Sequence, residues 1–155
     1  MKRIILYYHI LALGLTIGVN ILNLFSSSSN NQYRILAIII CGPAFYWAIK
    51  HILNFEDFLK TGSLSLFLFN LIQVFVFSIS GIMFKIICGL TLVVALKKYP
   101  PDYDLIFDVK FSLVETLFYI DFKASDDIFY IGINLFQFIM VLYLFNMIKK
   151  GKKIG

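Results

Sequence analysis

The sequence is poor in the residues that build metal clusters, disulfide frameworks and hydrolytic sites. Among its 155 residues are only two cysteines and two histidines. Cys41 and Cys88 lie far apart inside apolar runs and form no C-x-x-C pair, which argues against a disulfide framework and is typical of buried, unreactive thiols. The chain also contains no H-E-x-x-H motif and no glycine-rich phosphate loop. We therefore predict no cofactor and no metal, and the sequence disfavours an enzyme.

Charge is equally scarce. Charged residues make up 15% of the chain and hydrophobic residues 60%, whereas soluble domains contain about 45–50% apolar residues. The apolar residues lie in long runs separated by short polar segments, which is the pattern of membrane helices. The formal net charge is +5, but the cations lie mainly at the ends of the runs, where they act as head-group anchors. No basic face interleaved with aromatic residues lies outside the runs, so we predict no nucleic-acid partner.

The apolar residues form six segments between polar connectors. We predict that these segments are helices at residues 4–25, 33–53, 63–78, 82–97, 104–120 and 127–149. The first segment follows Lys2 and Arg3 as a signal peptide would, but it is longer than usual and no A-x-A site follows it, so we interpret it as an uncleaved span. Residues 1–155 are thus predicted to form a single integral membrane domain, an all-α bundle of six short transmembrane spans.

The long apolar run in the middle of the chain leaves an alternative open. From Ser63 to Leu96 its only ionisable side chain is Lys85, and as one helix it would be about 50 Å long against a bilayer core of about 30 Å. We expect the serines and glycine of Ser78–Gly81 to turn the chain. In the alternative, the run crosses once with a re-entrant piece, and 104–120 is an interfacial amphipathic helix, which leaves four spans.

The distribution of lysine and arginine favours six spans, because that topology gathers most of them on one side of the membrane. Both topologies have an even number of spans, so both predict that the N- and C-termini are cytoplasmic. The bias toward Phe, Ile, Lys and Asn is typical of AT-rich genomes, and we predict the cytoplasmic (inner) membrane of a bacterium. The predicted partners are the lipid bilayer and either another membrane protein or further copies of the chain.

Polar side chains inside the apolar segments are candidates for a polar path or for helix packing. Three pairs of amides are spaced by three residues and would share a helix face, and an amide in lipid needs a partner. Asp108 and Glu115 would also share a face, and within a span Glu115 would be a candidate ion or proton site. The candidate residues are Asn20, Asn23, Asn70, Gln73, Asn134, Gln137, Asp108 and Glu115.

Small residues mark the predicted helix contacts, because they let two backbones approach closely. Gly14 and Gly18 form a G-x-x-x-G motif in the first segment. Ala37, Ala44 and Ala48, together with Cys41, form a stripe in the second segment. These residues suit packing within the chain or between copies.

Three functions are compatible with such a bundle. We predict a non-enzymatic membrane subunit, an accessory or effector component that acts through helix–helix association. The alternative is a small transporter or channel whose polar path is lined by the amides and Glu115. A more distant alternative is a membrane enzyme or haem protein, because His9 and His51 fall near the same predicted membrane face.

Overall fold

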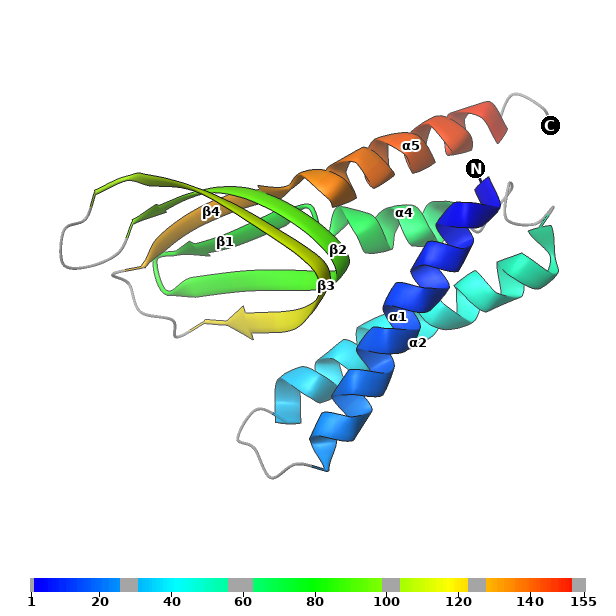
Figure 1. Cartoon of the computed structure of the whole chain (residues 1–155), viewed down its shortest axis with the longest axis horizontal. Helices are drawn as coiled ribbons and strands as arrows, with labels where there is room; N and C mark the ends of the chain where they lie inside the picture. Colours follow the sequence, from blue (N-terminus) through cyan, green and yellow to red (C-terminus); the bar gives the residue numbers. More distant parts are fainter. Residues whose placement is uncertain (1, 26–30, 56–62, 99–103, 123–127, 152–155) are drawn as a thin grey trace. The chain divides into compact units, whose positions relative to one another are not determined.

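The computed structural model describes residues 2–25, 31–55, 63–98, 104–122 and 128–151 (Figure 1). In chain order the elements are α1 (Lys2–Leu24), α2 (Asn31–Leu53), α4 (Ser63–Leu71), β1 (Phe75–Ile79), β2 (Ile82–Lys98), β3 (Ile106–Asp121), β4 (Phe129–Asn134) and α5 (Leu135–Gly151). Most of the predicted connectors, at 26–30, 56–62, 99–103 and 123–127, lie outside the described residues.

The prediction of an all-α bundle is wrong, both with six spans and with four, because the protein has mixed α/β structure. Residues predicted as the helices 82–97 and 104–120 form the long strands β2 and β3, and the predicted helix 63–78 is a short helix followed by β1. The last predicted helix, 127–149, begins as β4 and becomes helical only at Leu135. The first two predicted helices coincide closely with α1 and α2.

Contacts divide the chain into two units, which we describe separately. The helical unit comprises Met1–Asn70 and Met140–Gly155, and the sheet unit comprises Leu71–Ile139. Within the described residues, Arg3–Leu24 and Asn31–Leu53 are long and apolar enough to cross a membrane. Both helices keep large apolar side chains exposed, such as Leu11 and Leu22 on α1 and Ile39 on α2.

In the helical unit, α1 packs against α2. The side of α2 that is buried carries small residues, among them Ala37, Cys41 and Ala48, which let the backbone of the neighbouring helix approach. A second cluster joins Leu6 of α1, Leu66 of α4 and Leu144 of α5, all fully buried. The core of this unit is therefore built from contacts between helices that are distant in sequence.

The sheet unit consists of four antiparallel strands in the order β1-β4-β2-β3. Strand β1 pairs with the start of β2 and also with β4, and β4 in turn pairs with the end of β2. These three strands therefore close into a ring. β2 takes part in the ring with both its start and its end, and this is possible because the strand is irregular at Gly89. This glycine has a φ of 90°, and the β2–β3 register shifts between Gly89 and Thr91. A glycine tolerates that φ because it has no Cβ.

A two-residue turn joins β1 to β2. Ser80 and Gly81 have φ values of 50° and 78°, and Ile79 pairs with Ile82 across the turn. Positive φ at both central residues is the signature of a type I′ turn, whose twist matches that of a β-hairpin. The turn lies within Ser78–Gly81, where the sequence predicts that the chain turns, but it joins two strands and not two helices. Inside the ring, Val76, Ile87, Val93 and Ala95 form the core, with Tyr130 packed against them.

Candidate functional site

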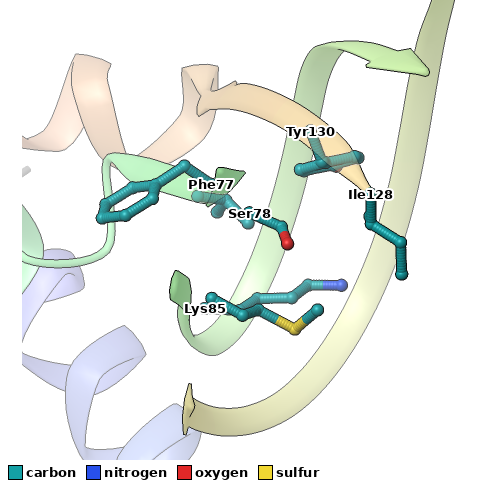
Figure 2. A pocket seen from close by; sticks show the side chains of 7 residues that line it. Phe77, Ser78, Lys85, Ile128 and Tyr130 are labelled. Atoms are coloured by element: carbon teal, nitrogen blue, oxygen red, sulfur yellow. The ribbon is translucent and has the colours of Figure 1, made fainter. Parts of the chain in front are cut away.

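A pocket of about 120 Å³ opens into the sheet unit beside the β1–β2 hairpin (Figure 2). Its wall is mainly apolar and comes from three strands and the residue preceding β4. The lining residues are Val76, Phe77, Ser78, Met83, Lys85, Ile128 and Tyr130. Figure 2 shows the Ser78 hydroxyl and the Lys85 amine directed into the same space, while the Phe77 ring points away from it. The pocket thus combines an apolar wall with two polar groups.

Lys85 gives the pocket a positive charge. Its Nζ lies 3.8 Å from Glu115 Oε1, and the same oxygen lies 2.6 Å from Nζ of Lys110. One carboxylate is therefore shared by two ammonium groups, which leaves an excess of one positive charge among the three side chains. Burial lowers the pKa of Lys85; Glu115 opposes this shift and Lys110 adds to it. Such a lysine gains more from an anionic ligand than a fully hydrated lysine would, because it has already lost part of its hydration.

Ser78 supplies the second polar group. The residue is 2% exposed, and its Oγ has no hydrogen-bond partner among the residues that the structure describes. A buried hydroxyl without a partner costs free energy, and such groups at a pocket wall mark places where a ligand or water completes the bonding. Strand geometry directs the Ser78 side chain into the ring. Side chains along a strand point alternately to its two sides, so Val76 and Ser78 both lie on the inner side of β1 and Phe77 lies on the other side.

The predicted amide residues of the sheet unit bind the irregular part of β2. Gln73 Oε1 accepts a hydrogen bond from Cys88 N at 2.7 Å, and Asn134 Oδ1 accepts one from Leu92 N at 3.2 Å. Gln137 Nε2 is 3.5 Å from the Cys88 carbonyl oxygen. Asn134 also accepts from the backbone N–H of Gln137 at 3.5 Å, which makes it the N-cap of α5. These side chains satisfy backbone groups where strand pairing is interrupted.

The other predicted amides lie in the helical unit. Asn70 bonds the ring of His9 on α1, with Nδ2 at 2.8 Å from Nε2, so the predicted pair Asn70 and Gln73 is split between the two units. Asn20 donates from Nδ2 to the Thr16 backbone carbonyl at 2.8 Å. At Asn23 it is the backbone carbonyl, not the side-chain amide, that accepts a hydrogen bond from Arg34. The structure therefore brings Gln73, Asn134 and Gln137 together in the sheet unit, whereas the remaining amides belong to the helical unit.

The predicted acidic residues lie on β3. Asp108 Oδ2 is 3.2 Å from Nζ of Lys97, and Glu115 additionally accepts a hydrogen bond from the Thr91 hydroxyl at 3.3 Å. The two residues lie on the same side of the sheet, because they face Ala95 and Gly89 on β2 and the register shift compensates for their odd spacing. Glu115 thus belongs to the charge cluster at Lys85.

The predicted small-residue contacts lie in the helical unit. A Cβ built on Gly14 would meet the Phe45 ring of α2 at 3.3 Å, whereas one on Gly18 would meet nothing within 4 Å. Ala37, Ala44 and Ala48 are buried on α2. Of the G-x-x-x-G motif, only Gly14 is thus close to a side chain of another helix.

The predicted function as a multi-pass subunit acting through helix–helix association is wrong, and so is the transporter alternative. Both required a bundle of spans, but β2 and β3 occupy the fourth and fifth predicted helices, and the third is a short helix followed by β1. The haem alternative required the same bundle and is wrong as well. Nδ1 of His9 is 2.7 Å from the Ile5 carbonyl and Nε2 contacts Asn70, so both ring nitrogens are engaged within the chain.

The sequence did not identify Ser78, Met83 or Tyr130 as site residues. The one signal was Lys85, the single charge in an otherwise apolar run, because a lone charge there requires a polar environment.

Among the described residues, no group of three or more His, Cys, Asp or Glu side chains is placed to hold a metal ion. No family model, curated protein or solved structure matches the chain.

Proposed function

We propose that the sheet unit is a non-enzymatic binding domain for a small monocarboxylate. The observation that carries this proposal is the buried Ser78 hydroxyl, which has no partner among the described residues and faces the same pocket as the Lys85 amine. A carboxylate accepts hydrogen bonds from both groups, and it neutralises the positive charge that Glu115 alone leaves uncompensated. The apolar wall then receives the hydrocarbon part of the ligand.

The size of the pocket limits that hydrocarbon part. Its volume is about 120 Å³, and an apolar cavity of about 150 Å³ holds one benzene molecule. The ligand class is therefore a carboxylate with a short aliphatic chain or a small ring. Butyrate is a suitable probe, and we expect a dissociation constant of about 1 mM or tighter.

The binding domain is proposed to be held at a membrane by α1 and α2. Lys2 and Arg3 precede the apolar part of α1, and Lys50 lies in the last turn of α2. The positive-inside rule places these ends in the cytoplasm. With two spans the rest of the chain lies on the same side, so both termini are cytoplasmic. The inner membrane of a bacterium remains the proposed location.

The binding proposal is tested by NMR on the full chain in mild detergent, with ¹³C-methyl labelling of the four methionines. Met83 lines the pocket, and its signal is assigned with Met83→Leu. We expect butyrate to shift this signal in a saturable way, whereas butyramide and butylammonium, which have the same chain without the negative charge, do not. Equal shifts with all three probes, or none with butyrate, would contradict the proposal.

Two lysines of β2 provide a matched comparison. Lys85→Gln removes the charge in the pocket and should weaken butyrate binding about tenfold or more, because a charged hydrogen bond contributes about 1.5–3 kcal/mol. Lys98→Gln removes a charge from the end of the same strand and should leave binding unchanged. An equal loss in both variants would indicate attraction by net charge alone.

A further inference from the structure

Two rows of apolar side chains cross all four strands of the sheet unit. The pairing register aligns Phe75, Ile133, Val94 and Val109 in one row. It aligns Phe77, Ile131, Leu96 and Phe107 in the next row. Residues that face each other on antiparallel strands point to the same side of a sheet, so these eight side chains form one continuous surface, which we call the outer face.

Six of the eight outer-face residues are exposed, and Phe77 and Val94 are half-buried. Phe75, Phe107 and Val109 are 55%, 65% and 55% exposed, and Leu96, Ile131 and Ile133 are 40% exposed or more. Beside it lies a shallow apolar groove lined by Leu71, Ile72, Phe75, Phe77 and Phe84. A contiguous apolar surface of this kind on a sheet marks a site of interaction, because leaving it in contact with water is unfavourable.

Charge is segregated between the two sides of the sheet. Lys85, Lys97, Lys110 and Asp108 alternate with the outer-face residues along β2 and β3, so these charges lie on the opposite side. The register shift between Gly89 and Thr91 brings Glu115, which faces Gly89, to that opposite side as well. The eight residues of the outer face include no charge. Lys98 follows Leu96 by two positions on β2 and therefore lies on the same side, at the end of the apolar rows. The outer face is thus apolar with a cation at its rim.

We propose that the outer face lies on the surface of the bilayer that α1 and α2 enter. An apolar surface rich in phenylalanine, with a lysine at its rim and no acidic group, fits the boundary between acyl chains and anionic head groups. Anchoring by the two helices would hold the sheet near that boundary at high local concentration. The inference rests on the anchoring proposed above and not on the carboxylate pocket.

Adjacent residues of β3 supply the test. Trp47 is the single tryptophan of the chain, so Trp47→Phe gives a background without tryptophan. Phe107→Trp then reports from the outer face, and Ile106→Trp is the matched control from the other side, since Ile106 is also exposed, at 49%. The full-length variants are reconstituted into vesicles of phosphatidylcholine and phosphatidylglycerol that contain spin-labelled phospholipids.

We expect the lipid spin labels to quench tryptophan fluorescence at position 107 at least twofold more than at position 106. Equal quenching at the two positions, in protein that sediments with the vesicles, overturns the inference and leaves the anchoring intact. Protein that stays in the supernatant overturns both. Absent quenching at 107 together with cross-linking between Phe107→Cys copies at high dilution assigns the outer face to a second copy and overturns the bilayer contact.

A measurement without substitutions guards against misfolded variants. Unmodified protein is reconstituted with a phospholipid that carries a photoactivated diazirine on its acyl chain, and the labelled residues are mapped by mass spectrometry. Labelling concentrated at Phe107, Val109 and Phe111 relative to Ile106 and Lys110 supports the bilayer contact. Labelling confined to α1 and α2 overturns it.

Discussion

Gln73 and Cys88 are joined by a hydrogen bond from the Cys88 backbone N–H to Gln73 Oε1, at 2.7 Å and across 15 positions of the sequence. Gln73 is fully buried and lies between α4 and β1. Cys88 directly precedes Gly89, where the pairing of β2 with β3 shifts register. The Gln73 side chain therefore takes the place of a backbone carbonyl as hydrogen-bond acceptor, beside the irregularity in β2.

Gln73→Leu should lower the free energy of unfolding by about 1–3 kcal/mol, because it leaves a buried N–H without its acceptor. Thermal unfolding in mild detergent measures the loss, and amide hydrogen exchange at Cys88 should accelerate about tenfold or more. Gln32→Leu, at an exposed position of α2, is the control and should change neither quantity. An unchanged exchange rate at Cys88 in Gln73→Leu would contradict the assigned role.

Gly132 lies where β4 and β2 approach closely. A Cβ added there would be 3.0 Å from both Ala95 Cβ and Val93 Cγ1, so Gly132→Ala should destabilise the protein by about 1–3 kcal/mol through overpacking. Gly18→Ala places the same methyl group on α1, where nothing lies within 4 Å, and should raise stability by up to about 1 kcal/mol. Equal melting temperatures for the two variants would refute this packing.

Asn70 and His9 connect α4 to α1 inside the helical unit. The Ile5 carbonyl can only accept, so Nδ1 of His9 carries the proton, and Nε2 accepts from Asn70 Nδ2 at 2.8 Å. Asn70→Leu should lower the free energy of unfolding by about 1–3 kcal/mol, because Nε2 loses its donor in a buried site. The exposed Asn54 provides the control variant, Asn54→Leu, which should unfold as the parent does. Thermal unfolding distinguishes the two.

Butyrate binding should weaken as the pH rises. Burial lowers the pKa of Lys85 from its ordinary value of 10.5, so the ammonium form that binds the carboxylate disappears at a pH below that value. Among the described residues, the other titratable groups on this side of the sheet include Glu115, Lys110, Tyr119 and Asp121 on β3 and Tyr130 on β4, with Lys97 and Asp108 farther along the strands. An NMR titration at several pH values measures the midpoint, and Lys85→Gln should abolish this dependence. A parent midpoint at or above 10.5 would contradict the burial effect.

The same lowered pKa has a consequence for stability. Below the folded pKa of Lys85 the buried ammonium disfavours the folded state, because the unfolded chain holds the proton more tightly. Stability attributable to this residue therefore rises as the pH increases from the folded pKa toward 10.5. Comparing the melting temperatures of the parent and Lys85→Gln over this range isolates the contribution.

The sequence predicts α1 and α2 well, because each is an apolar run of helical length bounded by polar residues. For β2 the sequence predicts a helix wrongly. One side of this strand faces the core of the ring and the other side belongs to the outer face, so both sides are largely apolar, and the run from Ile82 to Leu96 resembles a membrane helix. For β3 a signal was present: Phe107 to Leu113 alternates strictly between apolar and polar residues, which indicates a strand.

The candidate site was harder to predict than the helices. The spacing of Asp108, Ser112 and Glu115 fits one helix face as well as it fits a strand with a register shift, and only the pairing of β3 with β2 decides between them. Ser78 and Tyr130 meet Lys85 because β1, β2 and β4 close into a ring, which no local pattern encodes. The sequence predicts that the amides need partners but not which ones, and most of the partners in the structure are backbone groups.

Closure of the ring also dictates an order of events during synthesis. β1 and β2 are translated first, and the two-residue turn that joins them involves only local residues. β4 completes the ring, and it is translated only after β2 and β3. Until then the second edge of β1 has no strand to pair with, and the nascent hairpin displays both an unpaired edge and its phenylalanines. We therefore expect a chain stalled before Phe129 to bind chaperones or to aggregate.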